Sequence, residues 1–327
     1  MTAAPLPTSL LAELGPYGRG ERVQCGVSLA PYTSFRIGGP AASLLTVERL
    51  SHLVAVLDIL HRRQVPFLML GGGTNVLISD AGVPDLVVLN HCHQIHWPAT
   101  PATTLLVRTD SGAPLAGLAR GAIKHHLAGL AWAASVPGTV GGAVVGNAGA
   151  HGGCVADNLH SASLWEDGQV QEVPSADLQY AYRCSRLKGV VAAPGVGPVV
   201  LAATFHLDPD PEGKDAALAD RFIAHRRLTQ PVDKSAGSIF KNPPGDYAGR
   251  LIEGLGLKGF AVGGAMVSPL HANFIVNRGD ATAAQVVRLM NHIRSAVYEH
   301  FAVVLEPEIL LVGDWSAGPR LSPLPAV

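Results

Sequence analysis

Two glycine-rich segments are the parts of this sequence best suited to hold a ligand. Gly71-Gly72-Gly73-Thr74-Asn75 lies between two predicted strands, and a longer segment covers residues 136–150. Because glycine has no Cβ, such a backbone can approach a ligand closely and direct N–H groups at phosphate oxygens. Packing alone would not offset the entropy of ordering the longer segment, which favours a large, flat, anionic cofactor as its partner. A simple turn for the first segment, and close packing between sheets for the second, remain the alternatives.

A third segment, residues 236–243, brings a serine together with cationic and amide side chains. Ser238 follows a glycine and precedes Lys241 and Asn242, so it is a candidate nucleophile, proton donor or cap. The sequence Gly-Ser-Ile-Phe-Lys lacks the second glycine of a hydrolase nucleophile elbow, which disfavours acyl transfer. The first glycine-rich segment, residues 71–75, likewise matches neither the dinucleotide fingerprint nor the phosphate-binding loop that ends in Lys-Ser/Thr.

A metal site is a weaker hypothesis. His91, Cys92, His93 and His96 have the side chains that zinc prefers, but no second group of ligands completes a site. We therefore expect no metal, and ordinary surface or core positions for these residues. The four cysteines form no Cys-x-x-Cys pair, and residues 1–20 do not resemble a secretory signal. Reduced thiols in the cytoplasm are the expectation.

The composition indicates a globular protein of two or three modules. The chain has 327 residues, of which 48% are hydrophobic and 15% charged, which excludes a mainly disordered protein. Its formal charge of -1 gives no reason to expect nucleic acid or an acidic membrane as a partner. Two long uncharged runs, residues 127–156 and 189–207, are interrupted by glycine and proline and do not read as membrane helices.

Hydrophobic periodicity predicts the elements that carry these segments. Residues 43–70 read as strand, helix, strand, and Thr282 with Gln285 matches a capping box before a long amphipathic helix. Further strands are expected at 76–78, 86–89, 105–107, 161–165, 169–173, 199–207 and 303–312, and helices near 216–227 and 247–255. Several strands have no helix between them, which favours an α+β fold with mixed sheets. The turn-rich residues 208–213 predict a module boundary, and residues 316–327 a loose tail.

Several blocks of sequence together carry a family resemblance. They begin at Thr33-Ser34-Phe35-Arg36-Ile37-Gly38-Gly39-Pro40-Ala41 and include both glycine-rich segments, Tyr182-Arg183 with Ser185, and the Ser238 segment. They continue with Arg226-Arg227, Gln230-Pro231, His271-Ala272-Asn273-Phe274-Ile275-Val276-Asn277 and Leu305-Glu306-Pro307-Glu308-Ile309. In these blocks the chain resembles the UDP-N-acetylenolpyruvoylglucosamine reductase family, flavin enzymes of bacterial wall synthesis. Cys184, Arg186 and Leu187 depart from the family's commoner residues.

The resemblance implies a fold and a cofactor. The fold is of the vanillyl-alcohol-oxidase/PCMH type, with two FAD-binding subdomains, expected at residues 1–65 and 66–212, and a C-terminal α+β substrate-binding domain at 213–327. The residues implied to hold FAD are Arg36, Gly71, Gly72, Gly73, Thr74, Asn75, Gly138, Thr139, Gly141, Gly142, Ala143 and Asn147. The first segment lacks the histidine that binds flavin covalently in some members of this wider group, so noncovalent FAD is expected.

The resemblance also implies a reaction in two stages. NADPH reduces FAD, and the enolpyruvyl group of UDP-N-acetylglucosamine enolpyruvate is then reduced. Arg183 is implied to stabilise the enolate, Glu308 to be its acidic partner, and Ser238 to protonate C2. The implied substrate-binding residues are Tyr182, Arg226, Lys234, Lys241 and Asn242, although Arg226, Arg227 and Lys234 are equally readable as solvated surface charges.

Two other functions compete with this one. An FAD oxidase of the same superfamily would use oxygen as its acceptor, and a noncatalytic flavin or nucleotide-sugar binding protein would have no use for Arg183, Ser238 and Glu308 together. The short stretch between Lys188 and Val199 favours the family subtype that lacks an additional substrate-closing loop. We expect a monomer.

Overall fold

The chain forms two compact units, each assembled from segments that are distant in sequence. The computed structural model describes residues 6–98, 105–188 and 197–323. Unit 1 comprises residues 1–25, 42–72 and 85–226, and unit 2 comprises residues 26–41, 73–84 and 227–327. The division expected at residues 65 and 212 is a different one and stays a prediction. The stretch between Lys188 and Val199, on which the expected subtype depends, lies mostly outside the described residues.

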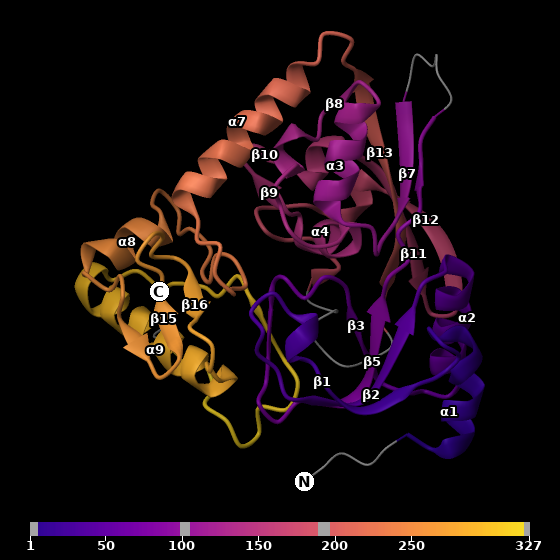
Figure 1. Cartoon of the computed structure of the whole chain (residues 1–327), viewed down its shortest axis with the longest axis horizontal. Helices are drawn as coiled ribbons and strands as arrows, with labels where there is room; N and C mark the ends of the chain where they lie inside the picture. The colour runs from indigo at the N-terminus through magenta and orange to yellow at the C-terminus, as the bar shows by residue number, and fades with distance from the viewer. Residues whose placement is uncertain (1–5, 99–104, 189–196, 324–327) are drawn as a thin grey trace. The chain divides into compact units, whose positions relative to one another are not determined.

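The first sheet has the strand order β1-β2-β5-β3, in which β3 and β5 are parallel. Its strands are β1 (Gln24–Ser28), β2 (Pro40–Val47), β3 (Phe67–Leu70) and β5 (Val83–Asn90). Helices α1 (Thr8–Leu14) and α2 (Leu50–Arg62) lie beside this sheet (Figure 1). Both share its core, to which α1 contributes Leu10 and Leu14 and α2 contributes Leu53, Leu57 and Leu60 from one face. Trp165 is fully buried in the same core and donates its indole N–H to Asp58 of α2 at 2.8 Å.

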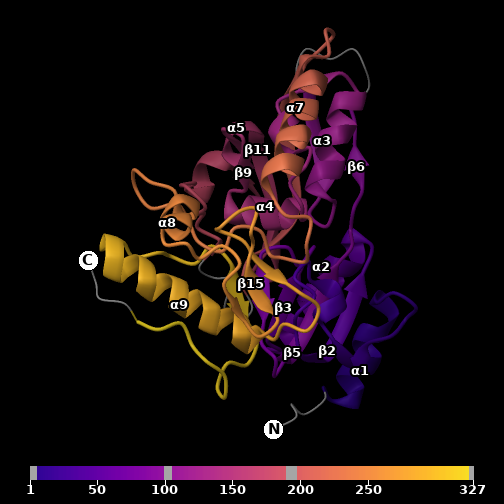
Figure 2. The same ribbon diagram turned by 60° about the vertical axis from the view of Figure 1, so that its left-hand side comes forward.

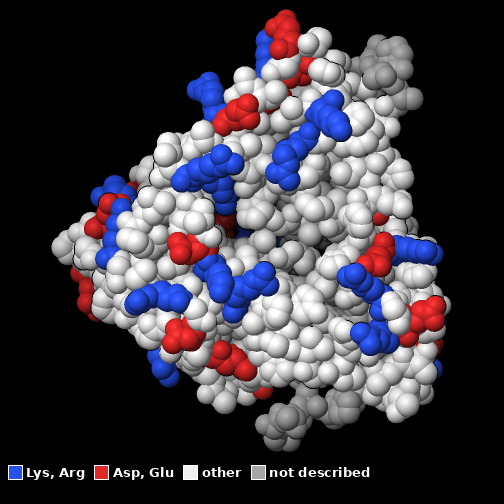
Figure 3. Space-filling view, viewed as in Figure 1, with Lys and Arg blue, Asp and Glu red and all other residues white. Residues whose placement is uncertain are grey.

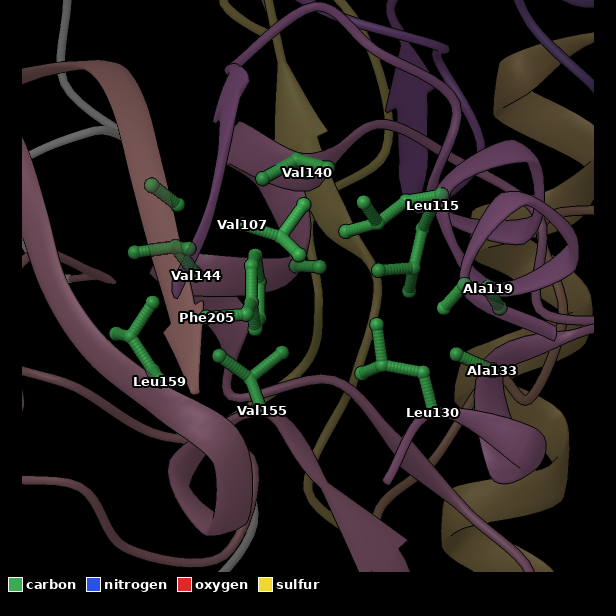
Figure 4. Close-up of a cluster of buried hydrophobic side chains, with 14 of the residues drawn as sticks. Val107, Leu115, Ala119, Leu130, Ala133, Val140, Val144, Val155, Leu159 and Phe205 are labelled. Carbon is green, nitrogen blue, oxygen red and sulfur yellow. The ribbon is translucent and has the colours of Figure 1, made fainter. Parts of the chain in front are cut away.

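The second sheet of unit 1 is antiparallel, with the order β12-β11-β13-β7-β6 and β8 paired to β13. Its strands are β6 (Ile95–His96), β7 (Leu105–Asp110), β8 (Leu127–Ala128), β11 (Leu159–Glu166), β12 (Gln169–Pro174) and β13 (Val199–Pro209). The helices of this part are α3 (Leu115–Lys124), α4 (Val140–Gly146), α5 (Val155–Asn158) and α7 (Lys214–Thr229), and β9 (Gly149–Ala150) pairs with β10 (Gly153–Cys154). Figure 4 shows their shared core, where Val107 and Phe205 of the sheet meet Leu115 of α3 and Val144 of α4.

Helix α7 belongs to this core, although the expected boundary near residue 213 assigned it to the C-terminal domain. It begins where Asp210 accepts hydrogen bonds from the N–H groups of Lys214 and Asp215. Its Ala219 is buried, and Phe222 and Ile223 pack against the core of the second sheet. Compact unit 1 accordingly extends to Arg226.

Unit 2 is built around a long helix, α9 (Ala283–Phe301; Figure 2), and this helix contacts β14, β15 and α8. Its other elements are α8 (Ala248–Gly254), the antiparallel strands β14 (Ala261–Val262), β15 (Ala265–Val267) and β16 (Ile275–Asn277), and the parallel pair β4 (Val76–Ile78) and β17 (Leu310–Val312). The predicted capping box is confirmed, since Thr282 accepts from the Gln285 N–H and Gln285 accepts from the Thr282 N–H. Short 3-10 helices occur at Gly15–Tyr17, Ala30–Tyr32, Ala131–Ala133 and Ser175–Leu178.

The expected elements are otherwise found, with two differences at the C-terminal end. The strand expected over residues 303–312 is wrong for its first part: only β17 is a strand, and Pro307 forms an isolated bridge with Phe240. Proline has no N–H to continue a ladder, which limits regular pairing there. The tail is not loose as far as Ser322, because buried Arg294 donates to the Ser322 carbonyl at 2.7 Å and Asn291 bonds both Arg320 and Ser322.

The surface shown in Figure 3 carries Lys and Arg interspersed with Asp and Glu, in agreement with the small net charge. Within the described parts of the chain, no helix combines the length and apolar character needed to traverse a bilayer.

Candidate active site

The two glycine-rich segments meet in unit 1, next to the start of α4. A Cβ atom on Gly71 would collide with the Thr139 side chain, and one on Gly141 would lie 2.9 Å from the Ser111 Cβ. Close packing therefore explains why these two positions are glycine. It does not explain Gly142, which is exposed and whose added Cβ would find Thr139 Oγ1 as its nearest neighbour, at 3.7 Å. The open side of Gly142 is where a ligand can approach the backbone of α4.

Helix α4 also fixes the turn that carries Arg183. Three side-chain hydrogen bonds join this turn to α4 or its end: Tyr180 Oη donates to the Val144 carbonyl at 3.0 Å, Ser185 Oγ to the Val145 carbonyl at 2.6 Å, and Asn147 Nδ2 to the Ala181 carbonyl at 3.0 Å. These anchors lie on both sides of Tyr182-Arg183. Burial raises the pKa of the Tyr180 phenol, so it stays a hydrogen-bond donor.

Asn147 is therefore a structural residue as well as an implied cofactor ligand. It ends α4 in the left-handed conformation, with φ of 43°, and its Oδ1 accepts from the Ala156 N–H at 3.1 Å. Asparagine tolerates this conformation better than most residues. One side chain thus links the end of the glycine-rich segment to the Arg183 turn.

In unit 2, the segment that carries Ser238 lies between two other segments. Ser238 forms an antiparallel bridge with Phe274, and Phe240 forms one with Pro307. The Glu308 N–H donates to the Ile239 carbonyl at 2.8 Å, and the Lys241 N–H donates to the Glu306 carbonyl at 2.9 Å. The hydroxyl of Ser238 and the carboxyl of Glu308 therefore come from neighbouring, hydrogen-bonded segments.

The same unit joins the second half of the first glycine-rich segment to Glu308. Asn75 Nδ2 donates to the Glu308 carbonyl at 3.2 Å, and the Leu310 N–H donates to the Asn75 carbonyl at 3.0 Å. The parallel pairing of β4 with β17 continues from this point. A segment implied to hold the cofactor and a residue implied to act on the substrate are thus adjacent in one unit.

The block around Arg36 is part of unit 2 as well. Ser34 Oγ donates to the Ser235 carbonyl at 2.7 Å, and Asn277 Nδ2 donates to the Phe35 carbonyl at 3.0 Å. Arg36 is exposed, and its guanidinium donates to the Pro31 carbonyl. Thr74 is partly buried, next to Gly73, which has a φ of 58° and lies against the Tyr32 carbonyl.

The implied substrate-binding residues of this group differ in their surroundings. Lys241 forms an ion pair of 2.8 Å with Glu306, and Asn242 Oδ1 accepts from the N–H of Ala248 at the start of α8, at 3.1 Å. Lys234 is exposed. Arg226 is half-buried on α7, and this burial lowers the pKa of its guanidinium.

The predicted residues thus fall into two groups. Unit 1 contains Gly71, Gly72, Gly138 to Ala143, Asn147, Tyr182 and Arg183. Unit 2 contains Gly73 to Asn75, Ser238, Lys241, Asn242 and Glu308. Sequence reasoning gave no role to Asn273 and Asn277, which bond the backbone of the site segments. Both lie in the block 271–277, which carries the resemblance. Two asparagines in this otherwise mostly apolar block are the signal that could have identified them, because buried amides need hydrogen-bond partners.

Cys92 and the histidines near it differ in burial: Cys92 is buried, His91 is partly buried, and His93 and His96 are exposed. Over the residues that the structure describes, no three His, Cys, Asp or Glu side chains are placed to hold a metal ion. Cys92 is fully buried, and burial, followed by the charge of Asp110, raises the pKa of its thiol to about 12. The pKa of the His91 imidazole is lowered, mainly because the residue is partly buried.

Two stretches of the chain match models of known protein families. Residues 41–173 match the family model of the FAD binding domain, and residues 230–312 match that of the C-terminal domain of UDP-N-acetylenolpyruvoylglucosamine reductase. The chain is 42% identical over 302 residues to the UDP-N-acetylenolpyruvoylglucosamine reductase of Prochlorococcus marinus, with 90% of this chain and 95% of the relative covered. It is 40% identical over 291 residues to that of Synechococcus sp. strain RCC307, with 88% and 93% covered.

A solved structure agrees with the sequence relatives. The crystal structure of UDP-N-acetylenolpyruvylglucosamine reductase (MurB) from Thermus caldophilus superposes with a TM-score of 0.73 at 34% identity, covering 89% of this chain and 99% of that one. The expected fold class, a PCMH-type FAD-binding fold followed by a C-terminal α+β domain, is confirmed. The chain belongs to the UDP-N-acetylenolpyruvoylglucosamine reductase family and carries that family's FAD-binding and C-terminal domains.

Proposed function

We propose that this chain reduces the enolpyruvyl group of UDP-N-acetylglucosamine enolpyruvate to give UDP-N-acetylmuramate for peptidoglycan synthesis, using FAD and electrons from NADPH. Family membership supports the flavin-dependent reduction. The observation that carries the assignment of residues is the position of Ser238 and Glu308 on adjacent segments that share backbone hydrogen bonds.

The residues present fit FAD. Two side-chain-poor segments meet at Gly71 and Thr139, and the open side of Gly142 leaves the backbone accessible to a pyrophosphate. When bound, FAD supplies storage of a hydride between the nicotinamide and the substrate. Residues 71–80 contain neither histidine nor cysteine, which supports noncovalent binding.

The chain's own residues would then manage charge and protons on the substrate. Arg183 would bind the substrate carboxylate and stabilise the negative charge that spreads onto it when hydride adds at C3. Ser238 would give its hydroxyl proton to C2, and the resulting alkoxide would regain a proton from solvent. Glu308, held next to the Ser238 segment, would be the acidic group on that side of the enolate.

Anaerobic stopped-flow measurements on Ser238→Ala test this assignment. We expect flavin bleaching by NADPH at the wild-type rate, because that step needs no proton at the substrate, and loss of colour recovery when enolpyruvyl substrate is added. Ser51→Ala, which removes an exposed hydroxyl on α2, is the matched control and should behave as wild type in both steps. Product formation by Ser238→Ala at the wild-type rate would refute the role of Ser238.

The nicotinamide preference and the electron acceptor need separate tests. We expect a higher kcat/KM with NADPH than with NADH, and no rapid reoxidation of reduced flavin by oxygen. Reoxidation by oxygen that outpaces reoxidation by substrate would favour the FAD oxidase. We further propose that the enzyme acts in the cytoplasm as a monomer, which fractionation and light scattering can check.

A further inference from the structure

The backbone that carries Ser238 changes its hydrogen-bonding partner in the middle of the segment. At Ser238 the neighbour is Phe274, and at Phe240 it is Pro307. The bonds that flank the second bridge, from Lys241 to Glu306 and from Glu308 to Ile239, leave the N–H and carbonyl of Phe240 directed away from Pro307. Phe240 is 1% exposed, so water cannot satisfy these two groups.

One side chain satisfies both of them. Asn273 Oδ1 accepts from the Phe240 N–H at 3.0 Å, and Asn273 Nδ2 donates to the Phe240 carbonyl at 2.8 Å. The Asn273 carbonyl also accepts from the Ile239 N–H at 2.9 Å. The amide side chain therefore acts as the peptide group of a missing strand, at the point where the backbone before Phe274 turns away.

The backbone of Asn273 is held as well. Asn273 is buried, with 4% exposure, and its backbone N–H donates to His271 Nδ1 at 3.2 Å. An asparagine amide presents one acceptor and one donor side by side, which matches the two groups of Phe240. Aspartate has the same shape but places an acceptor opposite the Phe240 carbonyl, and serine cannot reach both groups.

We propose that Asn273 is the positioning residue that sets where Ser238 presents its hydroxyl for protonation of the substrate. This inference rests on the proposed role of Ser238. Proton transfer needs donor and acceptor within hydrogen-bond reach, and a displacement of about 1 Å can reduce a rate about 100-fold. Asn273 acts on the backbone two residues from Ser238 and does not itself contact the substrate.

The test compares Asn273→Asp with Asn291→Asp in the full-length holoenzyme. Asn291 makes the same pair of bonds, one donated and one accepted, to the backbone of Arg320 and Ser322 in the tail, so it controls for the loss of an amide clamp as such. In Asn273→Asp the Phe240 N–H keeps an acceptor, but the second carboxylate oxygen repels the Phe240 carbonyl and pushes this backbone away. We therefore expect faster hydrogen exchange of the Phe240 N–H, unchanged flavin reduction by NADPH, and substrate reduction slower by about 100-fold. Asn291→Asp should leave all three unchanged.

The configuration at C2 of the product's lactyl group is a second measurement. A variant that is only less stable would still give a single C2 epimer. If Ser238 is displaced, water protonates the enolate from either face, so product from Asn273→Asp should contain both C2 epimers by NMR. Wild-type substrate reduction with a single epimer, together with faster Phe240 exchange, would overturn the proposal. If Asn273→Asp fails to fold, Asn273→Ser is measured in the same way and judged by the same outcomes.

Failure of this inference is distinguishable from failure of the proposed function. A wild-type protein that does not reduce the enolpyruvyl substrate would refute the function, whatever the Phe240 exchange shows. If the wild-type protein reduces the substrate and the Asn273 variants do so with the same kinetics, only the positioning role is refuted.

Discussion

Removal of the Asp80 carboxylate should destabilise unit 2 through the first turn of α9. Asp80 Oδ1 accepts from the Ala283 N–H at 2.7 Å, and Oδ2 accepts from the Ala284 N–H at 2.9 Å. Thr282 binds the next N–H, that of Gln285. The N–H groups at the start of a helix have no partner within the helix, so Asp80 supplies two bonds that the local sequence does not.

The expected magnitude follows from these two bonds and the charge. Loss of a side-chain cap costs about 1–2 kcal/mol, and loss of a negative charge at a helix N-terminus about 0.3–1 kcal/mol more. Asp80→Ala should therefore lower the free energy of unfolding of unit 2 by about 1.3–3 kcal/mol. Asp80→Asn keeps one acceptor oxygen and should lose about 1 kcal/mol.

Guanidinium unfolding, together with hydrogen exchange of residues 283–286, measures the effect. Asp220→Ala, at an exposed position on α7, is the control and should change the free energy by less than about 0.5 kcal/mol. Hydrogen exchange should accelerate in the first turn of α9 in Asp80→Ala and stay unchanged in the control. If Asp80→Ala and Asp220→Ala have equal effects, the distant carboxylate does not cap α9 in solution.

Three further predictions concern thiols, acid stability and backbone conformation. In the native protein, iodoacetamide at pH 8 should modify exposed Cys25 and Cys184 but not Cys92, because the Cys92 thiol is buried and its pKa is raised to about 12. Peptide mapping that finds Cys92 modified as fast as Cys25 would contradict this prediction. Hydrogen bonds from the Arg250 side chain, and then from the Tyr247 N–H, lower the pKa of Asp246 to about 2, so its stabilising contribution should be complete above about pH 4 and disappear as the pH falls through about 2. NMR titration should show the Asp246 pKa returning toward its ordinary value in Arg250→Gln, and an unchanged titration would exclude that ion pair. Gly73→Ala should lower the free energy of unfolding by about 1–3 kcal/mol, because φ at residue 73 is 58° and the new methyl group would meet the Tyr32 carbonyl. The control Gly146→Ala adds a methyl group with no neighbour within 4 Å. Equal losses of stability in the two variants, measured by thermal unfolding, would refute the argument.

Local patterns predicted the elements that form from nearby residues. The Thr282 and Gln285 pair with its apolar face predicted α9 because all the groups involved lie within a few turns of the same helix. The part of the cap that comes from Asp80 was not predicted, since the two bonded positions are more than 200 residues apart. The first part of the strand expected over residues 303–312 was wrong because Leu305 and Ile309 are buried by tertiary contacts without a regular ladder, and only β17 pairs as a strand.

The residues of the candidate site could be proposed from the sequence, but the bonds that hold them could not. Glycine placement favoured a ligand at residues 136–150 and left a ligand or a simple turn open for residues 71–75, and the resemblance supplied Arg183, Ser238 and Glu308. Nothing in the sequence around Tyr182 indicates that Asn147, Tyr180 and Ser185 anchor the Arg183 turn to α4.

The sequence by itself determined the chemistry that this chain can offer: side-chain-poor backbone for an anionic cofactor, and a hydroxyl, a guanidinium and a carboxyl for the substrate. Only the tertiary structure decided that the Ser238 segment lies between Phe274 and Pro307, and that Asn273 completes it. The physical reason is that every backbone N–H and carbonyl is chemically alike, so a segment does not encode which distant partner it will bond. That choice depends on how the buried side chains of the whole unit pack.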